Sequence, residues 1–139
     1  MEILHLNVEA SKRLYEAHKD IVQPNLCYNN ISHIMVAMPN LFRSGQWKVA
    51  YGYVGTTEQI CCRHAFVWSE SEGVIDPTEF AKNPIKVTRP YYITKTCTPE
   101  EYVLAISEEN GYPALQEYLR QEDMAAQKWA LANGLFFIG

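Results

Sequence analysis

The chain has 139 residues, of which 47% are hydrophobic and 20% charged, and its formal net charge is −4. These proportions are typical of a single folded domain, here expected over residues 1–139, and they exclude a disordered chain because the apolar content is enough for a core. The excess of acidic residues argues against a nucleic-acid partner, since binding a phosphate backbone requires clustered Lys and Arg.

The first residues and the cysteines indicate a compartment. Residues 1–7 carry no basic leader, and no stretch reaches the roughly 18 apolar residues that a membrane span requires. We therefore expect a cytoplasmic protein with no membrane partner. Thiols stay reduced there, so free thiols are expected at the four cysteines, Cys27, Cys61, Cys62 and Cys97.

Two helices are predicted near the N-terminus. In residues 8–22, apolar side chains recur every three or four positions, which is the period of one helix face. Pro24 lies just after this segment and ends it. A second helix is predicted over residues 26–38, with Asn25 as its N-cap. Cys27 then lies in the first turn, where the positive end of the helix dipole favours a thiolate.

The middle of the chain is predicted to form an antiparallel sheet. Side chains alternate in character over residues 47–54 and again over 60–68, with turn residues between the two segments. A short strand is predicted at 74–76. A further strand is predicted over 85–94, where Pro90 favours the edge of a sheet.

The last third of the chain is predicted to be helical. Residues 98–101, Thr-Pro-Glu-Glu, form a capping box with proline at the first helical position. Another helix is predicted over residues 113–133. Helices, then strands, then helices predict an α+β domain in which the helix bearing Cys27 packs on the sheet and the C-terminal helices cover it.

Three residues of this pattern suit nucleophilic catalysis. A catalytic cysteine requires a base that keeps it ionised and a third group that orients the base. His64 lies on a predicted strand, and Asp76 ends the next one, so a hairpin would bring the two side chains close. Cys27 can join them if its helix packs on the same part of the sheet.

The same residues carry a family resemblance. The His-Ala-Phe-Val-Trp stretch from His64 and the stretch Gly73–Thr78, which ends in Asp-Pro-Thr, resemble the His and Asp segments of transglutaminase-like members of the papain-like cysteine enzymes. The segment Cys27–Asn30 is similar to the nucleophile helix of small bacterial and phage members. The resemblance spans residues 23–78, less than half of the chain.

The resemblance implies a papain-like core in which Cys27 is the nucleophile, His64 the base and Asp76 the group that orients the base. The Gln23 side chain and the backbone amide of Cys27 are candidate oxyanion donors, of which the backbone amide is the stronger. The implied reaction is attack on an amide or ester carbonyl, through a thioester and without a cofactor. A peptide, a protein or a small amide or ester would be the substrate, and either hydrolysis or acyl transfer would follow.

Other interpretations stay open. A silent relative that binds a protein or peptide, or a structural protein without a site, would also fit the pattern, and a His64 ring turned away from Cys27 would favour the former. A zinc site that includes Cys61 and Cys62 is not expected, because neighbouring strand residues point to opposite faces. Oligomeric state cannot be read from the sequence.

The remaining aromatic and charged residues have simpler interpretations. Trp47, Tyr51 and Tyr53 are predicted to pack against the helices, with a substrate groove beside Cys27 as the functional alternative. Arg63 is expected to point away from His64 as a surface charge.

Overall fold

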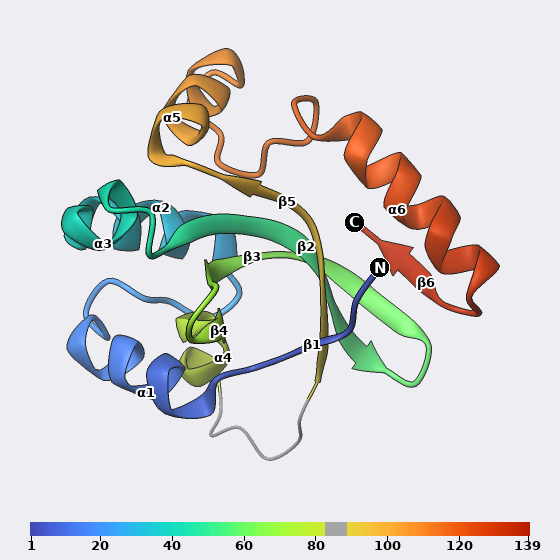
Figure 1. The fold of residues 1–139 in the computed structure, drawn as a ribbon, viewed down its shortest axis with the longest axis horizontal. Coiled ribbons are helices and arrows are strands. Elements are labelled where there is room, and N and C mark those ends of the chain that lie inside the picture. The colour runs from blue at the N-terminus through green and yellow to red at the C-terminus, as the bar shows by residue number, and fades with distance from the viewer. Residues whose placement is uncertain (83–88) are drawn as a thin grey trace.

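The computed structural model describes residues 1–82 and 89–139. Within these residues it is an α+β fold with six helices and a six-stranded sheet, which confirms the expected fold class (Figure 1). The helices are α1 (Val8–Ala17), α2 (Cys27–Ala37), α3 (Pro39–Arg43), α4 (Pro77–Lys82), α5 (Pro99–Glu108) and α6 (Arg120–Ala132). The strands are β1 (Leu4–His5), β2 (Lys48–Thr57), β3 (Ile60–Ser69), β4 (Gly73–Ile75), β5 (Pro90–Cys97) and β6 (Phe136–Ile138).

The strands follow the order β1-β5-β2-β3-β4, with β6 added in parallel to β3 and the other pairs antiparallel. β3 pairs with β4 only through residues 67–69 and with β6 only through residues 60–62. Residues 63–66 of β3 therefore pair with β2 on one side and with no described strand on the other. This open edge is important because it contains His64, and α2 packs against β3.

The N-terminal segment links β4, at one end of the strand order, to β1 at the other end. β1 pairs with β5, while Leu6 forms a parallel bridge with Val74 of β4. The backbone amide of Asn7 donates to the Val74 carbonyl at 2.8 Å. The sheet thus curls into a small barrel, whose interior cluster is Ala50, Val54, Phe66, Val74 and Tyr91.

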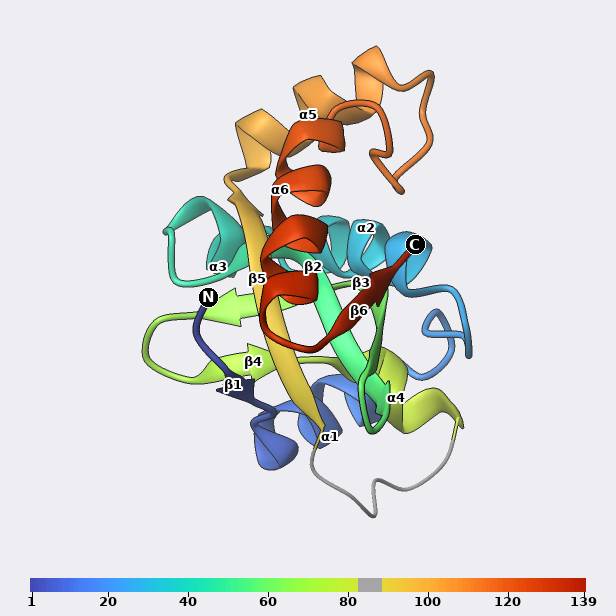
Figure 2. The same cartoon turned by 90° about the vertical axis from the view of Figure 1, so that its right-hand side faces the viewer.

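Two further clusters lie on the other face of the strands. The larger one receives the apolar sides of α1, α2 and α5 against Val49 and Tyr51. The smaller one packs α6 and β6 against Tyr53 and Tyr92. Figures 1 and 2 show α5 and α6 at one end of the molecule and α1 and α4 at the other. None of the described helices has the length and apolarity needed to cross a bilayer.

Several predicted boundaries are wrong in the first half of the chain. α1 ends at Ala17, five residues early, because His18 leaves the helical region and its carbonyl accepts from Ile21 and Val22 in a turn. Asn25 is not the cap of α2. It adopts a left-handed conformation, with φ of 65°, and the N-cap is Leu26.

In the second half of the chain, the predicted and observed elements differ because of contacts with residues far away in the sequence. The capping box of α5 is present as predicted. The final helix starts at Arg120 rather than at 113, because Leu115 is left-handed (φ 53°) and side chains bind the carbonyls of Pro113 and Ala114. β5 is an internal strand and tolerates Pro90 as its first residue. Residues 85–88 of the predicted strand lie outside the described residues.

Candidate active site

The His64 and Asp76 side chains are in direct contact. Val67 pairs with Ile75, so Asp76 lies one position beyond the last pair, diagonal to His64 on the same face of the sheet. The distance from Nε2 of His64 to Oδ2 of Asp76 is 2.7 Å, and Asp76 is fully buried. Tyr91 donates its hydroxyl to the same oxygen at 2.7 Å.

The surroundings of His64 favour its charged form. Burial opposes the charge, but the charge and hydrogen bond of Asp76, followed by the hydrogen bond and charge of Cys27, raise the pKa of His64 well above 6.5. Because Asp76 binds Nε2, Nδ1 is the ring atom of His64 that stays available to another group. Burial, together with the charges of Asp76 and Glu79, raises the pKa of Tyr91, whose hydroxyl therefore stays protonated and donates.

Cys27 is the first residue of α2 and is 8% exposed. The first amides of a helix have no partner within the helix, and the N-cap residue Leu26 supplies no side-chain acceptor for them. The Cys27 amide can therefore donate to an anionic oxygen that forms next to the sulfur. The structure thus joins His64 on β3 directly to Asp76 after β4, and it places Cys27 at the start of α2, which packs against β3.

Asn30 fixes the chain around Cys27, and the sequence analysis did not identify it. Its side chain is buried; it accepts from the Gln23 amide at 2.9 Å and donates to the Gln23 carbonyl at 2.7 Å. The same side chain donates to Oγ1 of Thr78 at 2.9 Å. One residue thereby joins the segment before α2 to the Asp-Pro-Thr segment. A signal was present, because asparagine is unfavourable inside a helix unless its side chain has another role.

The structure gives the Gln23 side chain no hydrogen bond among the described residues that would support a role as an oxyanion donor. Its backbone is held by Asn30, but its side chain is exposed. The expectation for its side-chain amide therefore gains no support from the geometry, and the Cys27 backbone amide remains the candidate donor.

The three aromatic residues considered for a groove are buried. Trp47 is 7% exposed, and Tyr51 and Tyr53 are fully buried. Tyr51 packs between Tyr28 and Tyr102, and Tyr53 stacks on Phe137. The helices predicted to cover the sheet occupy the face of Tyr51 and Tyr53, and Trp47 lines a pocket of about 200 Å³ beside α1 and α3 that does not include Cys27.

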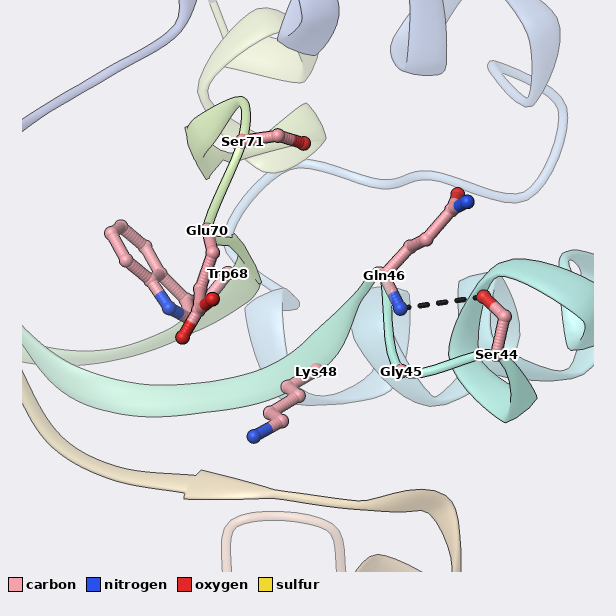
Figure 3. A pocket seen from close by; sticks show the side chains of 7 residues that line it. All are labelled: Ser44, Gly45, Gln46, Lys48, Trp68, Glu70 and Ser71. Carbon is pink, nitrogen blue, oxygen red and sulfur yellow. Dashed lines mark hydrogen bonds between the residues drawn. The ribbon is translucent and has the colours of Figure 1, made fainter.

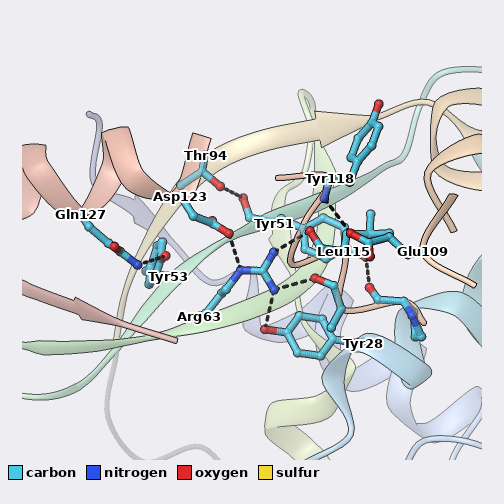
Figure 4. Close-up of polar contacts among 12 residues, drawn as sticks. Tyr28, Tyr51, Tyr53, Arg63, Thr94, Glu109, Leu115, Tyr118, Asp123 and Gln127 are labelled. Carbon is cyan, nitrogen blue, oxygen red and sulfur yellow. Dashed lines mark hydrogen bonds and ion pairs between the residues drawn. The ribbon is translucent and has the colours of Figure 1, made fainter. Parts of the chain in front are cut away.

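The expectation that Arg63 is a surface charge is wrong. Its side chain is 4% exposed, and its Nε donates to Asp123 at 2.8 Å. Nη1 donates to the Ala114 carbonyl at 2.6 Å and to the Tyr28 hydroxyl at 3.2 Å (Figure 4). Burial of an arginine requires such partners, and these come from residues far away in the sequence.

The residues that could present ligand atoms to a metal differ from those considered in the sequence. Among the described residues, His64, Asp76 and Glu79 place one ligand atom each within 4.8 Å of one another. His64 and Asp76 already bind each other, and Glu79 accepts from Arg89 at 3.4 Å. An ion would have to replace these contacts, so we assign no metal site here. Cys61 and Cys97 are buried apart from this group, and Cys62 is half-buried.

A surface pocket of about 320 Å³ lies elsewhere, between the start of β2 and the end of β3 (Figure 3). Lys48 and Glu70 give it charges of both signs, and Trp68 gives it an apolar wall. Cys27, His64 and Asp76 do not line it, so it is separate from the candidate site.

Comparison of the chain with family models, with curated proteins and with solved structures found no match in any of the three. Inference about function therefore depends on the geometry of the site and on the resemblance of the motifs.

Proposed function

We propose that the protein is a papain-like, transglutaminase-like cysteine enzyme that attacks amide or ester carbonyls with Cys27. The observation that carries this proposal is the 2.7 Å contact between a buried His64 and Asp76, with Cys27 at the start of the helix that packs against the strand of His64. The order of nucleophile, base and orienting group along the chain, and a helix start placed against a curled sheet, support the papain-like core.

In the proposed reaction, the Cys27 thiolate attacks the carbonyl carbon and forms a carbon–sulfur bond. The Cys27 amide stabilises the negative oxygen that develops. The His64 imidazolium protonates the departing amine or alcohol as its bond to carbon breaks, leaving a thioester. Water or an amine, deprotonated by His64, then attacks the thioester and releases the thiolate. Asp76 keeps the ring in the orientation that both proton transfers require.

The main alternative is a catalytically silent domain that binds a protein or peptide. A silent domain has no need for a protonated histidine beside a thiol at a helix start. The contact of His64 with Asp76 and the raised pKa of His64 therefore favour the enzyme, and the reactivity of the Cys27 thiol separates the two possibilities.

The test is alkylation by iodoacetamide at pH 6, followed by peptide mass spectrometry. We expect Cys27 to react at least about tenfold faster than Cys62, because ordinary thiols are almost fully protonated at that pH. Cys62 is the matched control: it is more exposed than Cys27, so better access cannot explain faster reaction of Cys27. Equal rates, or a faster Cys62, would favour the silent binding domain.

A second measurement tests acyl transfer itself. An activated ester such as p-nitrophenyl acetate should acetylate the protein once, on Cys27, and release a burst of nitrophenol equal to the protein concentration. The Cys27→Ser and His64→Ala variants should lose the burst. A burst that persists in Cys27→Ser would place the nucleophile elsewhere.

A further inference from the structure

We infer that Arg63 is a positioning residue that holds the start of α2 against β3, so that Cys27 stays in register with His64. This inference rests on the proposed function and deepens it, because it concerns how the reactive pair is kept together.

The hydrogen bonds of Arg63 reach three separate parts of the chain. From β3, its guanidinium donates to Asp123 on α6 and to Tyr28 on α2. It also donates to the carbonyls of Ala114 and Leu115, at 2.6 and 3.5 Å. Figure 4 shows the guanidinium in the middle of these partners. The planar group with five N–H donors is the one side chain that can serve so many acceptors at once.

Stacking strengthens the link to α2. The Arg63 guanidinium carbon lies 5.5 Å from the ring centres of both Tyr28 and Tyr51. The two rings are themselves nearly parallel, with centres 6.0 Å apart. Tyr28 is therefore fixed by its ring as well as by its hydroxyl, and these restraints hold in a buried environment where cation–π contacts are strong.

The contacts of Arg63 matter for the candidate site because of where the contacting residues lie in the sequence. Tyr28 directly follows Cys27, and Arg63 directly precedes His64. Alternation along β3 sends Arg63 and His64 to opposite faces of the sheet, yet Arg63 binds Tyr28 at the start of α2 and Cys27 in the same turn helps to raise the pKa of His64. This is possible because α2 meets β3 at its open edge. Arg63 and His64 thus lie on two sides of the first turn of α2. Without the contacts of Arg63, the Cys27 sulfur could move relative to the His64 imidazole.

The experiment compares Arg63→Lys with the wild type in the iodoacetamide assay at pH 6. Lysine keeps the positive charge but lacks the planar fork that binds several partners. We expect the Cys27 rate to fall about tenfold or more, and the ratio of the Cys27 rate to the Cys62 rate at pH 6 to approach one. The Cys62 rate should not change. Near-ultraviolet circular dichroism establishes that the variant is folded.

A milder substitution covers the case in which Arg63→Lys does not fold. Tyr28→Phe removes only the hydroxyl that accepts from Arg63 and keeps the stacked ring. We expect a Cys27 rate about threefold lower, as the loss of one of several restraints implies. Tyr112→Phe is the matched control, because that side chain is 71% exposed, and it should leave the rate unchanged.

A double substitution separates positioning from a merely structural role. If Arg63 acts through His64, then adding Arg63→Lys, or Tyr28→Phe where the lysine variant is unfolded, to His64→Ala should slow Cys27 no further. If the substitution slows Cys27 labelling by the same factor in the His64→Ala protein as in the wild type, the inference is overturned. If Cys27 of the wild type is labelled fast and keeps that rate in these variants, the inference is overturned but the proposed function stands. A slow wild type would overturn both.

Discussion

At the scale of single residues, the Asp76 carboxylate is the group that most requires partners within the protein. It is fully buried, and its Oδ2 accepts from both His64 and Tyr91. A buried charge is costly unless it is paired and hydrogen-bonded. Here the pairing partner is an imidazolium, so the same contact that stabilises the carboxylate also favours the charged form of the base.

Asp76→Asn should lower the rate of Cys27 alkylation at pH 6 by tenfold or more. The amide keeps the shape of the side chain but no longer stabilises the imidazolium, and it can select the wrong tautomer of His64. The free energy of unfolding should change by no more than about 2 kcal/mol, the usual range for one substitution. Labelling kinetics test the first expectation and urea denaturation the second. Unchanged Cys27 kinetics would reduce the site to a cysteine and a histidine.

Stability should depend on pH through His64. Its folded-state pKa lies well above 6.5, so the folded protein binds this proton more tightly than the unfolded chain does. The resulting stabilisation is fully present below about pH 6.5 and is lost as the pH rises through the folded-state pKa, at about 1.4 kcal/mol per pH unit within that window. Urea denaturation at a series of pH values from about 5 to 9 measures this pH dependence. The range brackets the ordinary histidine pKa of about 6.5.

The Asp76→Asn variant is the reference for this measurement. Without the carboxylate, the largest influence that raises the pKa of His64 is gone. Its free energy of unfolding should therefore lack the decline that the wild type shows above about pH 6.5. Parallel curves for the two proteins would mean that Asp76 does not set the protonation of His64.

At the scale of elements, β2 is held between β3 and β5 at the level of the site. Gly52 pairs with His64 on one side and with Ile93 on the other, next to an irregularity in the pairing with β5. A Cβ at this position would lie 1.8 Å from the carbonyl oxygen of Tyr92. The close approach of two backbones, rather than a special backbone angle, is what requires glycine here.

Gly52→Ala should therefore destabilise the protein severely, by about 4 kcal/mol or more, because a backbone carbonyl cannot move away as a flexible side chain can. The thermal transition measures this loss. Gly139→Ala is the matched control, since a Cβ there meets nothing within 4 Å, and it should be neutral. A stable Gly52→Ala protein would mean that β5 can move away from β2 without cost.

The sequence predicted the elements whose signals are local. Alternation identified the hairpin of β2 and β3, which carries His64, and the box of Thr98 and Glu101 identified the start of α5. β1 and β6 were not predicted: they are too short to show a period, and unlike the equally short β4, neither directly follows a predicted strand and turn. Arg63 was assigned to the surface because arginines usually lie there, and its partner Asp123 is 60 residues away.

At the scale of the whole molecule, the barrel is closed by the residues before α1. The Asn7 side chain has two roles: it accepts from the Ala10 amide as the N-cap of α1, and it donates to the Glu72 carbonyl. Ser11, one turn later, accepts from the Asp76 amide at 2.9 Å. The N-terminal segment therefore supports the chain that carries Asp76.

Asn7→Ala should lower the free energy of unfolding by about 1 to 3 kcal/mol, because it removes both a helix cap and a link to the turn before β4. Cys27 labelling at pH 6 should fall less than threefold, since the backbone bond from Asn7 to Val74 remains. Asn7→Asp, which keeps the cap but loses the donor, should be intermediate in stability. Thermal denaturation of the three proteins gives the order, and an Asn7→Ala protein as stable as the wild type would contradict it.

The link between Arg63 and Asp123 also bears on the order in which a ribosome delivers the chain. Cys27, His64 and Asp76 all emerge before Asp123, which is 60 residues beyond Arg63. Until α6 is made, the arginine lacks the carboxylate that allows it to be buried, and the start of α2 lacks its second restraint. Docking of α6 would therefore complete the contacts that hold the start of α2 against β3, and rapid labelling of Cys27 would be acquired only after α6 has been made.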